Sequence, residues 1–177
     1  MHKALFLDRD GVVNVDYGYV HKKENFHFID GIFDLVKAAN KKKFKVIIVT
    51  NQAGIARGYF SEKQFLEITN WMKECFQKND CFIDKVYYCP FHPTEGIGPY
   101  LRDAFCRKPN PGMLFYARKE VGVDFSKSIL VGDSKSDMIA AERAGINKLF
   151  FYNKKASQKK YESVQSLHQI LDFINDF

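Results

Sequence analysis

Short apolar runs and amphipathic segments alternate along almost the whole chain. Unbroken runs rich in Val, Ile, Leu and Phe are typical of parallel strands that are buried on both faces. Segments whose apolar residues recur every three or four positions are typical of helices packed on such a sheet. The unbroken runs predict strands at residues 3–7, 45–50, 84–89, 128–132 and 148–152. The periodic segments predict helices that begin near residues 30, 61, 111, 136 and 163.

This alternation of strands and helices predicts a fold of the α/β class. A strand–helix order from end to end favours a central parallel sheet with helices on both faces, which is a three-layer sandwich. A length of 177 residues suits one well-buried core and is short for two ordinary domains. We therefore expect a single domain over residues 1–177.

Local signals mark the ends of several predicted helices. Asp30 and Ser61 are N-cap candidates, because their side-chain oxygens can accept hydrogen bonds from the first free N–H groups of a helix. Pro111 suits a first helical turn. Gly122 and Gly145 are positioned to end the helices that precede them.

Three segments are predicted as loops or connectors, namely residues 51–58, 89–108 and 153–160. The longest of them, residues 89–108, is interrupted by several Pro and Gly residues. Irregular loops of this length are uncommon in compact domains and are usually functional. The segment is therefore a candidate source of functional residues.

Composition and charge narrow the class of protein. With 46% hydrophobic and 27% charged residues, the chain has the composition of a soluble globular protein. The stretch before Asp8 is too short for a secretory signal, so we expect a cytoplasmic protein without a membrane partner. The net charge of +6 suits an anionic partner, either nucleic acid or a small phosphorylated molecule. The four cysteines form no CxxC motif, and we expect no disulfides.

Polar residues follow the predicted strands at the edge where open α/β sheets bind ligands. Asp8 and Asp10 follow the first strand, Thr50 ends the second, Asp133 follows the fourth, and Lys108 lies after the long loop. Crowded carboxylates at the edge of a core need a compensating cation, and Mg²⁺ prefers such oxygen ligands. A hydroxyl and an ammonium could stabilise phosphoryl oxygens. Each residue also has an ordinary explanation as a strand end, a solvated lysine or a helix cap.

The order of these residues resembles the four motifs of the haloacid dehalogenase superfamily of phosphotransferases. The matching motifs are Asp8-Arg9-Asp10-Gly11, Thr50-Asn51, Lys108 and Gly132-Asp133-Ser134-Lys135-Ser136-Asp137. Residues 8–14, 16–20, 50–60 and 106–113 are in addition similar to the D-glycero-D-manno-heptose 1,7-bisphosphate phosphatase family, whose members have no cap domain. The resemblance extends over residues 5–145.

The resemblance implies a Rossmann-like sandwich of the capless type and a Mg²⁺-dependent phosphatase. Its implied reaction is hydrolysis of the 7-phosphate of the heptose bisphosphate through an aspartyl-phosphate, on the route to nucleotide-activated heptose for surface polysaccharide. Asp8 would be the nucleophile, and Asp10 the general acid and then the base. Thr50 and Lys108 would stabilise the phosphoryl group. Mg²⁺ would be held by the Asp8 carboxylate, the Asp10 carbonyl and Asp133, and Asp137 would orient Lys108 or the metal waters.

The resemblance also implies a set of substrate-binding residues. They are Asp16, Tyr17, Gly18, Tyr19, Asn51, Gln52, Ala53, Arg57, Arg107 and Ser134. Arg107 is the best candidate for the second phosphate, because a guanidinium matches phosphate geometry. A surface arginine is the alternative for Arg107, and loop packing is an equally good explanation of Tyr17 and Tyr19.

One departure from the family concerns zinc. The family commonly carries a structural zinc in the long loop, with a Cys-x-His pair and a Cys-x-Cys pair as ligands. The corresponding residues here are Cys89, Phe91, Ala104 and Cys106. Because two of the four ligands are replaced, we expect no structural zinc, with His92 and Asp103 as the possible substitute donors.

Three other functions stay open at this point. A histidinol-phosphate phosphatase shares the superfamily motifs, but residues 18–20 and 57–60 favour the heptose family. A polynucleotide 3′-phosphatase would suit the basic charge, but we identify no basic arm or aromatic stacking platform and expect no nucleic-acid partner. A non-catalytic phosphate-binding protein is disfavoured because Asp8 and Asp10 are both present. We expect a monomer with a phosphosugar substrate, whose preferred anomer the sequence leaves undecided.

Overall fold

A six-stranded parallel sheet forms the centre of the molecule, whose computed structural model describes residues 1–152 and 160–176. The strands lie in the order β3-β2-β1-β4-β5-β6, and every neighbouring pair is parallel. Their bounds are Ala4–Leu7 (β1), Lys45–Asn51 (β2), Lys85–Cys89 (β3), Ile129–Gly132 (β4), Lys148–Tyr152 (β5) and Glu162–Val164 (β6). The chain builds outward from β1 first to one side and then to the other. The topological switch point, where open sheets bind ligands, therefore lies beside β1.

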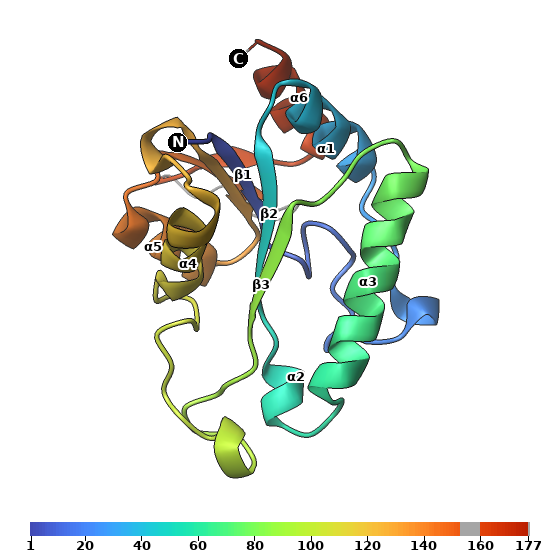
Figure 1. Ribbon diagram of the computed structural model, residues 1–177, viewed down its shortest axis with the longest axis vertical. Coiled ribbons are helices and arrows are strands. Elements are labelled where there is room, and N and C mark those ends of the chain that lie inside the picture. Colours follow the sequence, from blue (N-terminus) through green and yellow to red (C-terminus); the bar gives the residue numbers. More distant parts are fainter. Residues whose placement is uncertain (153–159, 177) are drawn as a thin grey trace.

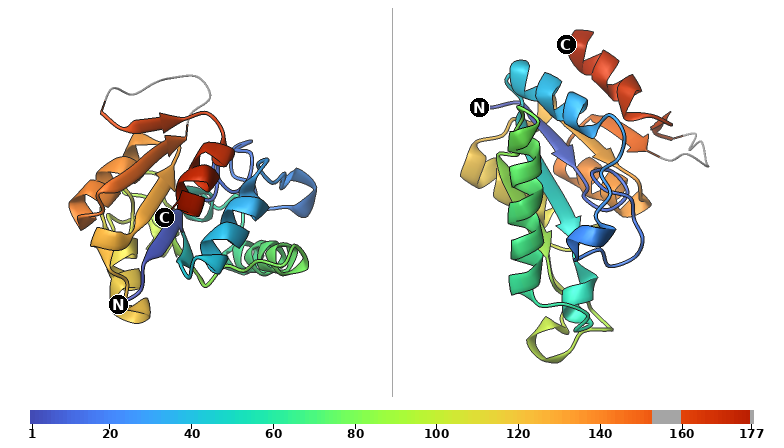
Figure 2. Two further views of the ribbon diagram at one scale, coloured as in Figure 1. Left: turned by 90° about the horizontal axis from the view of Figure 1, so that it is seen from above. Right: turned by 90° about the vertical axis from the view of Figure 1, so that its right-hand side faces the viewer.

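Helices cover both faces of this sheet (Figures 1 and 2). Their bounds are Ile32–Lys41 (α1), Ala53–Ala56 (α2), Glu62–Lys78 (α3), Gly112–Val121 (α4), Lys135–Ala144 (α5) and Leu167–Asp176 (α6). Helices α1, α3 and α6 lie on one face, and α4 and α5 lie on the other. The predicted three-layer α/β sandwich is confirmed.

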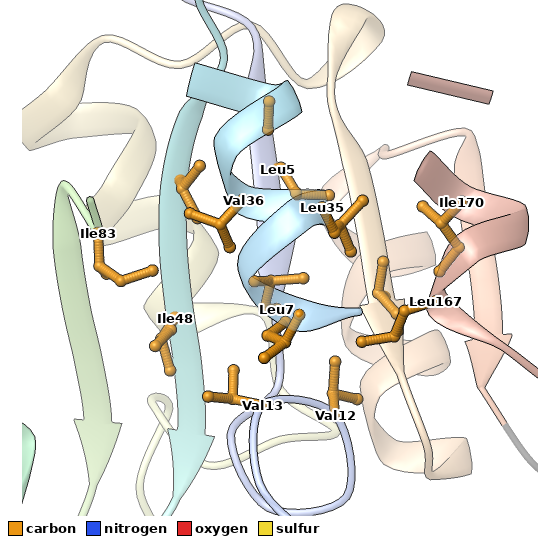
Figure 3. Packing of buried hydrophobic residues seen from close by; sticks show 14 of the residues in the cluster. Leu5, Leu7, Val12, Val13, Leu35, Val36, Ile48, Ile83, Leu167 and Ile170 are labelled. Carbon is orange, nitrogen blue, oxygen red and sulfur yellow. The ribbon is translucent and has the colours of Figure 1, made fainter. Parts of the chain in front are cut away.

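Alternate residues of β1 point into two separate hydrophobic clusters. Leu5 and Leu7 pack with residues of α1, α3 and α6, whereas Ala4 and Phe6 pack with residues of α4 and α5. All four are fully buried. Figure 3 shows the first cluster, in which Leu35 and Val36 of α1 lie over β1 and β2, and Leu167 and Ile170 of α6 lie on the side of α1 away from β2. Burial on both faces explains why the strand sequences are apolar throughout.

Three details of the predicted elements are wrong by one or two residues. Helix α1 has Gly31 as its N-cap, with a left-handed φ of 82°, and Asp30 lies one residue before it. Helix α5 begins at Lys135, because Ser134 and not Ser136 accepts the capping hydrogen bond. Pro111 is the N-cap residue of α4 and lies just before its first turn.

One short α-helix and one short strand were not predicted. Helix α2 lies inside the segment expected to be a loop, and β6 occupies the position where the last helix was expected to begin. Both are too short for a periodic pattern to be visible in the sequence. Strand β6 depends on pairing with β5, which is a tertiary contact. The predicted connector at residues 153–160 lies outside the described residues except for Lys160.

Within residues 1–152 and 160–176, no helix is both long and apolar enough to cross a membrane.

Ser61 starts α3 with a capping box and provides a test of this fold. Its side chain accepts a hydrogen bond from the Gln64 N–H, and the Gln64 side chain accepts one from the Ser61 N–H. We expect Ser61→Ala to lower the free energy of unfolding by about 1 kcal/mol, because the Gln64 N–H loses its partner. Urea denaturation measures this change. Ser61→Asp keeps an acceptor and should stay near the wild type, and equal stability of the two variants would contradict the capping role.

Candidate active site

The carboxyl ends of β1, β2 and β4 open into one cleft of about 450 Å³. These strand ends point toward α2 and the loop after β3, at the bottom of Figure 1. The cleft brings together most of the predicted site residues: Asp8, Asp10, Asp16, Gly18, Tyr19, Thr50, Asn51, Gln52, Ala53, Lys108, Asp133 and Ser134. Gly54, Ser136 and Asp137 also line it. Residues distant in sequence therefore meet where the sheet topology predicts a ligand site.

Three carboxylates form a compact acidic cluster in the cleft. Asp8 follows β1, Asp133 follows β4, and Asp137 lies in the first turn of α5. One oxygen atom of each lies within 4.8 Å of one oxygen of the other two. Gly11 makes room for the cluster, because a Cβ atom at this position would lie 2.0 Å from Asp133 Oδ2.

The buried Lys108 ammonium lies between two of these carboxylates. Its Nζ atom is 2.9 Å from Asp8 Oδ1 and 2.6 Å from Asp137 Oδ1, and it donates a hydrogen bond of 2.8 Å to the Val49 carbonyl. Burial alone would lower the pKa of Lys108, but Asp137 and Asp8 outweigh it and raise this pKa above its usual value. Lys108 is therefore a fixed cation at the base of the cleft, and Asp137 orients it.

Negative charge is still in excess around Lys108. Burial, together with Asp137 and Asp133, raises the pKa of Asp8 well above its usual value, although Lys108 opposes this shift. Burial and Asp137 raise the pKa of Asp133 to about 7. Three carboxylates facing one ammonium leave a surplus that a divalent cation would balance. An all-oxygen donor set of this kind fits Mg²⁺.

Hydrogen bonds with Asn51 and Ser134 hold Lys108 and Asp137 in place. The Asn51 amide pairs with the backbone of Lys108 in both directions, with two hydrogen bonds of 3.0 Å. The other oxygen of Asp137 accepts hydrogen bonds from the Ser134 hydroxyl and backbone N–H, at 2.7 and 3.0 Å. Asn51 and Ser134 were expected to bind substrate, and in the structure they hold Lys108 and Asp137 in place.

The Asp10 carboxylate has a different cationic partner from that of the acidic cluster. It pairs with the buried Arg9 guanidinium, with hydrogen bonds of 2.7 and 3.1 Å. Arg9 is only 1% exposed. In the sequence, Arg9 is distinguished only as part of the motif at residues 8–11, and its burial beside a carboxylate is visible only in the fold.

Three predicted substrate residues do not line the cleft. Tyr17 packs edge-on against His27, with ring centres 5.5 Å apart, which agrees with loop packing. Arg57 forms an ion pair with Glu95. Arg107 donates a hydrogen bond of 3.2 Å to the Phe91 carbonyl within the long loop. The guanidinium groups of both arginines are thus engaged outside the cleft.

The thiols of Cys89 and Cys106 lie side by side beneath the long loop. The Cys106 thiol donates to Cys89 Sγ at a distance of 2.9 Å. When Cys106 is ionised, the Cys89 thiol can donate to its thiolate instead, and this stabilisation is the main reason that the pKa of Cys106 falls to about 7. The His92 ring does not join them, because its Nδ1 atom accepts hydrogen bonds from the Thr94 and Glu95 backbone.

Comparisons with known proteins agree with this fold and site. A family model described as HAD-hydrolase-like matches residues 105–176. A D-glycero-beta-D-manno-heptose-1,7-bisphosphate 7-phosphatase of Vibrio cholerae is 44% identical over 174 residues, which are 98% of this chain and 92% of that protein. The corresponding alpha-named phosphatase of Burkholderia mallei is 50% identical over 145 residues, with coverages of 82% and 77%.

A solved structure of a phosphatase has a similar fold over almost its whole length. The D,D-heptose 1,7-bisphosphate phosphatase of B. bronchiseptica, complexed with magnesium and phosphate, has a TM-score of 0.85 and 26% identity, and the alignment covers 98% of both chains. The fold and the acidic cleft are those of a hydrolase of the haloacid dehalogenase superfamily, and the relatives of this chain are phosphatases. Within that superfamily, the chain belongs to the D-glycero-D-manno-heptose 1,7-bisphosphate 7-phosphatase family.

Gly132 offers a test of the cluster geometry. A Cβ atom at this position would lie 2.3 Å from Asp137 Cβ and 2.7 Å from Asp137 Cγ. We expect Gly132→Ala to displace Asp137 and with it Lys108, and so to lower the free energy of unfolding by about 1 to 3 kcal/mol. Phosphate release should fall by at least about tenfold, because catalytic groups tolerate little displacement. Thermal unfolding and a phosphate-release assay measure the two effects, and full activity would contradict the tight packing.

Proposed function

We propose that this chain hydrolyses the 7-phosphate of a D-glycero-D-manno-heptose 1,7-bisphosphate with Mg²⁺ as its cofactor. The single observation that carries the reaction class is the buried Lys108 between Asp8 and Asp137, at the switch point of the sheet. The names of the relatives support the substrate. A monomer in the cytoplasm and a single domain over residues 1–177 belong to the same proposal.

Asp8 is the proposed nucleophile. Its carboxylate attacks phosphorus and displaces the sugar oxygen, which gives an aspartyl-phosphate that water then hydrolyses. Lys108, 2.9 Å from Asp8 Oδ1, is placed to balance charge on the phosphoryl oxygens. Thr50 offers a hydroxyl in the same cleft. Asp10 is the proposed acid for the leaving oxygen and the base for the incoming water.

The acidic cluster is the proposed metal site. Asp8, Asp133 and the Asp10 carbonyl would hold Mg²⁺, and the bound ion would supply positive charge next to the transferred phosphoryl group. The excess of carboxylates over Lys108 supports this assignment. Asp137 is the alternative third ligand, but one of its oxygens already contacts Lys108 and the other contacts Ser134.

The cleft rim is the proposed sugar site. Asp16, Gly18, Tyr19 and Ala53 line the cleft around the acidic cluster. Arg107 stays our candidate for the second phosphate, and Tyr17 and Arg57 stay candidates for contacts with the substrate, although these three residues do not line the cleft. Because both arginines contact the long loop, a bisphosphate would have to extend toward that loop.

A substrate panel tests this function. With Mg²⁺ present, we expect kcat/KM to be highest for one anomer of heptose 1,7-bisphosphate, because the rim residues would bind the sugar and its second phosphate. The panel compares both anomers with histidinol phosphate and a 3′-phosphorylated oligonucleotide, and measures released phosphate. Preference for either of the last two would reject the heptose assignment.

Asp8→Asn should release no phosphate and keep a wild-type circular dichroism spectrum, and retained turnover would reject Asp8 as the nucleophile.

We also propose that the long loop binds no structural zinc. Phe91 and Ala104 occupy two ligand positions of the family pattern, and the His92 ring is engaged in its own turn. Protein purified without added zinc should therefore contain much less than one zinc per chain. Elemental analysis measures this ratio, with Cys106→Ala as a matched control. Stoichiometric zinc that disappears in Cys106→Ala would overturn the proposal.

A further inference from the structure

The Asp10 carboxylate accepts hydrogen bonds from four N–H groups of three side chains. Oδ1 accepts from Arg9 Nη2 at 2.7 Å and from Asn14 Nδ2 at 3.0 Å. Oδ2 accepts from Arg9 Nε at 3.1 Å and from Gln52 Nε2 at 3.0 Å. Donors that approach both oxygens of a carboxylate from several directions fix its orientation. The orientation of this carboxylate is therefore set from every side.

Arg9 is itself fixed in place. The same Nη2 atom donates a hydrogen bond of 2.6 Å to the Val20 carbonyl. The guanidinium carbon lies 5.8 Å from the ring centre of Phe26 and 5.7 Å from that of Phe65. A buried guanidinium held by a carbonyl and two rings gives Asp10 a rigid partner on the side away from the cleft.

Gln52 occupies the side of Asp10 that faces the cleft. It is 3% exposed, and its backbone N–H donates a hydrogen bond of 2.8 Å to the Cys89 carbonyl on β3. Its Nε2 atom lies 3.0 Å from Asp10 Oδ2 and 2.9 Å from Thr50 Oγ1. The two hydrogens of the Gln52 amide are therefore donated to Asp10 and Thr50, which both have a role in the proposed reaction.

This contact has a consequence for Thr50. A hydroxyl oxygen that accepts a hydrogen bond from Gln52 keeps its own hydrogen free to donate. The Thr50 hydroxyl can then point its hydrogen at a phosphoryl oxygen in the cleft. One amide group therefore sets the position of Asp10 and the donor role of Thr50 together.

We propose that Gln52 is a positioning residue for phosphoryl transfer, which acts through Asp10 and Thr50, and that Arg9 holds the opposite edge of Asp10. This inference rests on the proposed function and assigns Gln52 a different role from the substrate contact expected from the sequence. An amide whose two hydrogens are already donated to Asp10 and Thr50 has none left for a sugar hydroxyl.

Substitution of Gln52 tests the proposal by the way kcat and KM change. With heptose 1,7-bisphosphate and Mg²⁺, we expect Gln52→Leu to lower kcat by about 10- to 100-fold and to change KM by less than about threefold. Gln52→Glu keeps the shape but donates no hydrogen bond and places a carboxylate against Asp10, so its loss should be at least as large. Gln77→Leu, on the exposed end of α3, is the matched control and should leave both constants unchanged.

A double-mutant cycle separates positioning from independent binding. If Gln52 acts partly through Asp10, the factor lost in Gln52→Leu should shrink several-fold in the Asp10→Asn background. p-Nitrophenyl phosphate, whose leaving group needs little protonation, should be less affected by Gln52→Leu than the sugar phosphate. A rise in KM with unchanged kcat, or an equal loss factor in both backgrounds, would overturn the positioning role.

The same cycle distinguishes failure of this inference from failure of the proposed function. If Asp10→Asn turns over the sugar phosphate at the wild-type rate, the acid/base assignment of Asp10 is wrong. If Asp10→Asn loses turnover while Gln52→Leu shows the binding pattern, only the inference about Gln52 is wrong. Circular dichroism confirms folding of each variant, and Gln52→Met, which keeps the chain length, replaces Gln52→Leu if that variant unfolds.

Discussion

The contact of the Lys108 ammonium with Asp8 and Asp137 is the interaction on which the rest of the cleft depends. A buried ammonium and buried carboxylates each lose solvation, and they are tolerated together because each compensates the other. Asp8 comes from the end of β1, Asp137 from the first turn of α5, and Lys108 from the end of the long loop. The interaction therefore requires the parallel sheet, the helix on its face and the loop to be correctly placed at once.

Close packing of backbone and carboxylates makes this arrangement possible. Gly11 and Gly132 lie where any Cβ atom would overlap Asp133 or Asp137. The side chains of the cluster consequently have little freedom, and the negative charge stays concentrated around one cation. The surplus charge that remains is the physical argument for a divalent metal ion in a site of this kind.

The two aspartates of the first motif are stabilised in different ways although they are only one residue apart. Asp8 faces Lys108 and the other carboxylates, whereas Asp10 faces the buried Arg9 and two amide groups. Separate counter-charges remove the repulsion that two neighbouring carboxylates would otherwise have. They also keep the proposed nucleophile and the proposed acid/base in two distinct environments, as their different roles require.

The sequence by itself determined the fold class, the order of strands and helices, and most of the residues that meet in the cleft. It could do so because buried parallel strands are continuously apolar, and because the polar residues after them must gather at one edge of the sheet. Only the tertiary structure decided that Gln52 joins Asp10 to Thr50 and that Arg9 is buried. It also decided that Arg57 and Arg107 contact the long loop outside the cleft. Such contacts join segments far apart in the chain, and no local pattern specifies where a side chain will find its partner.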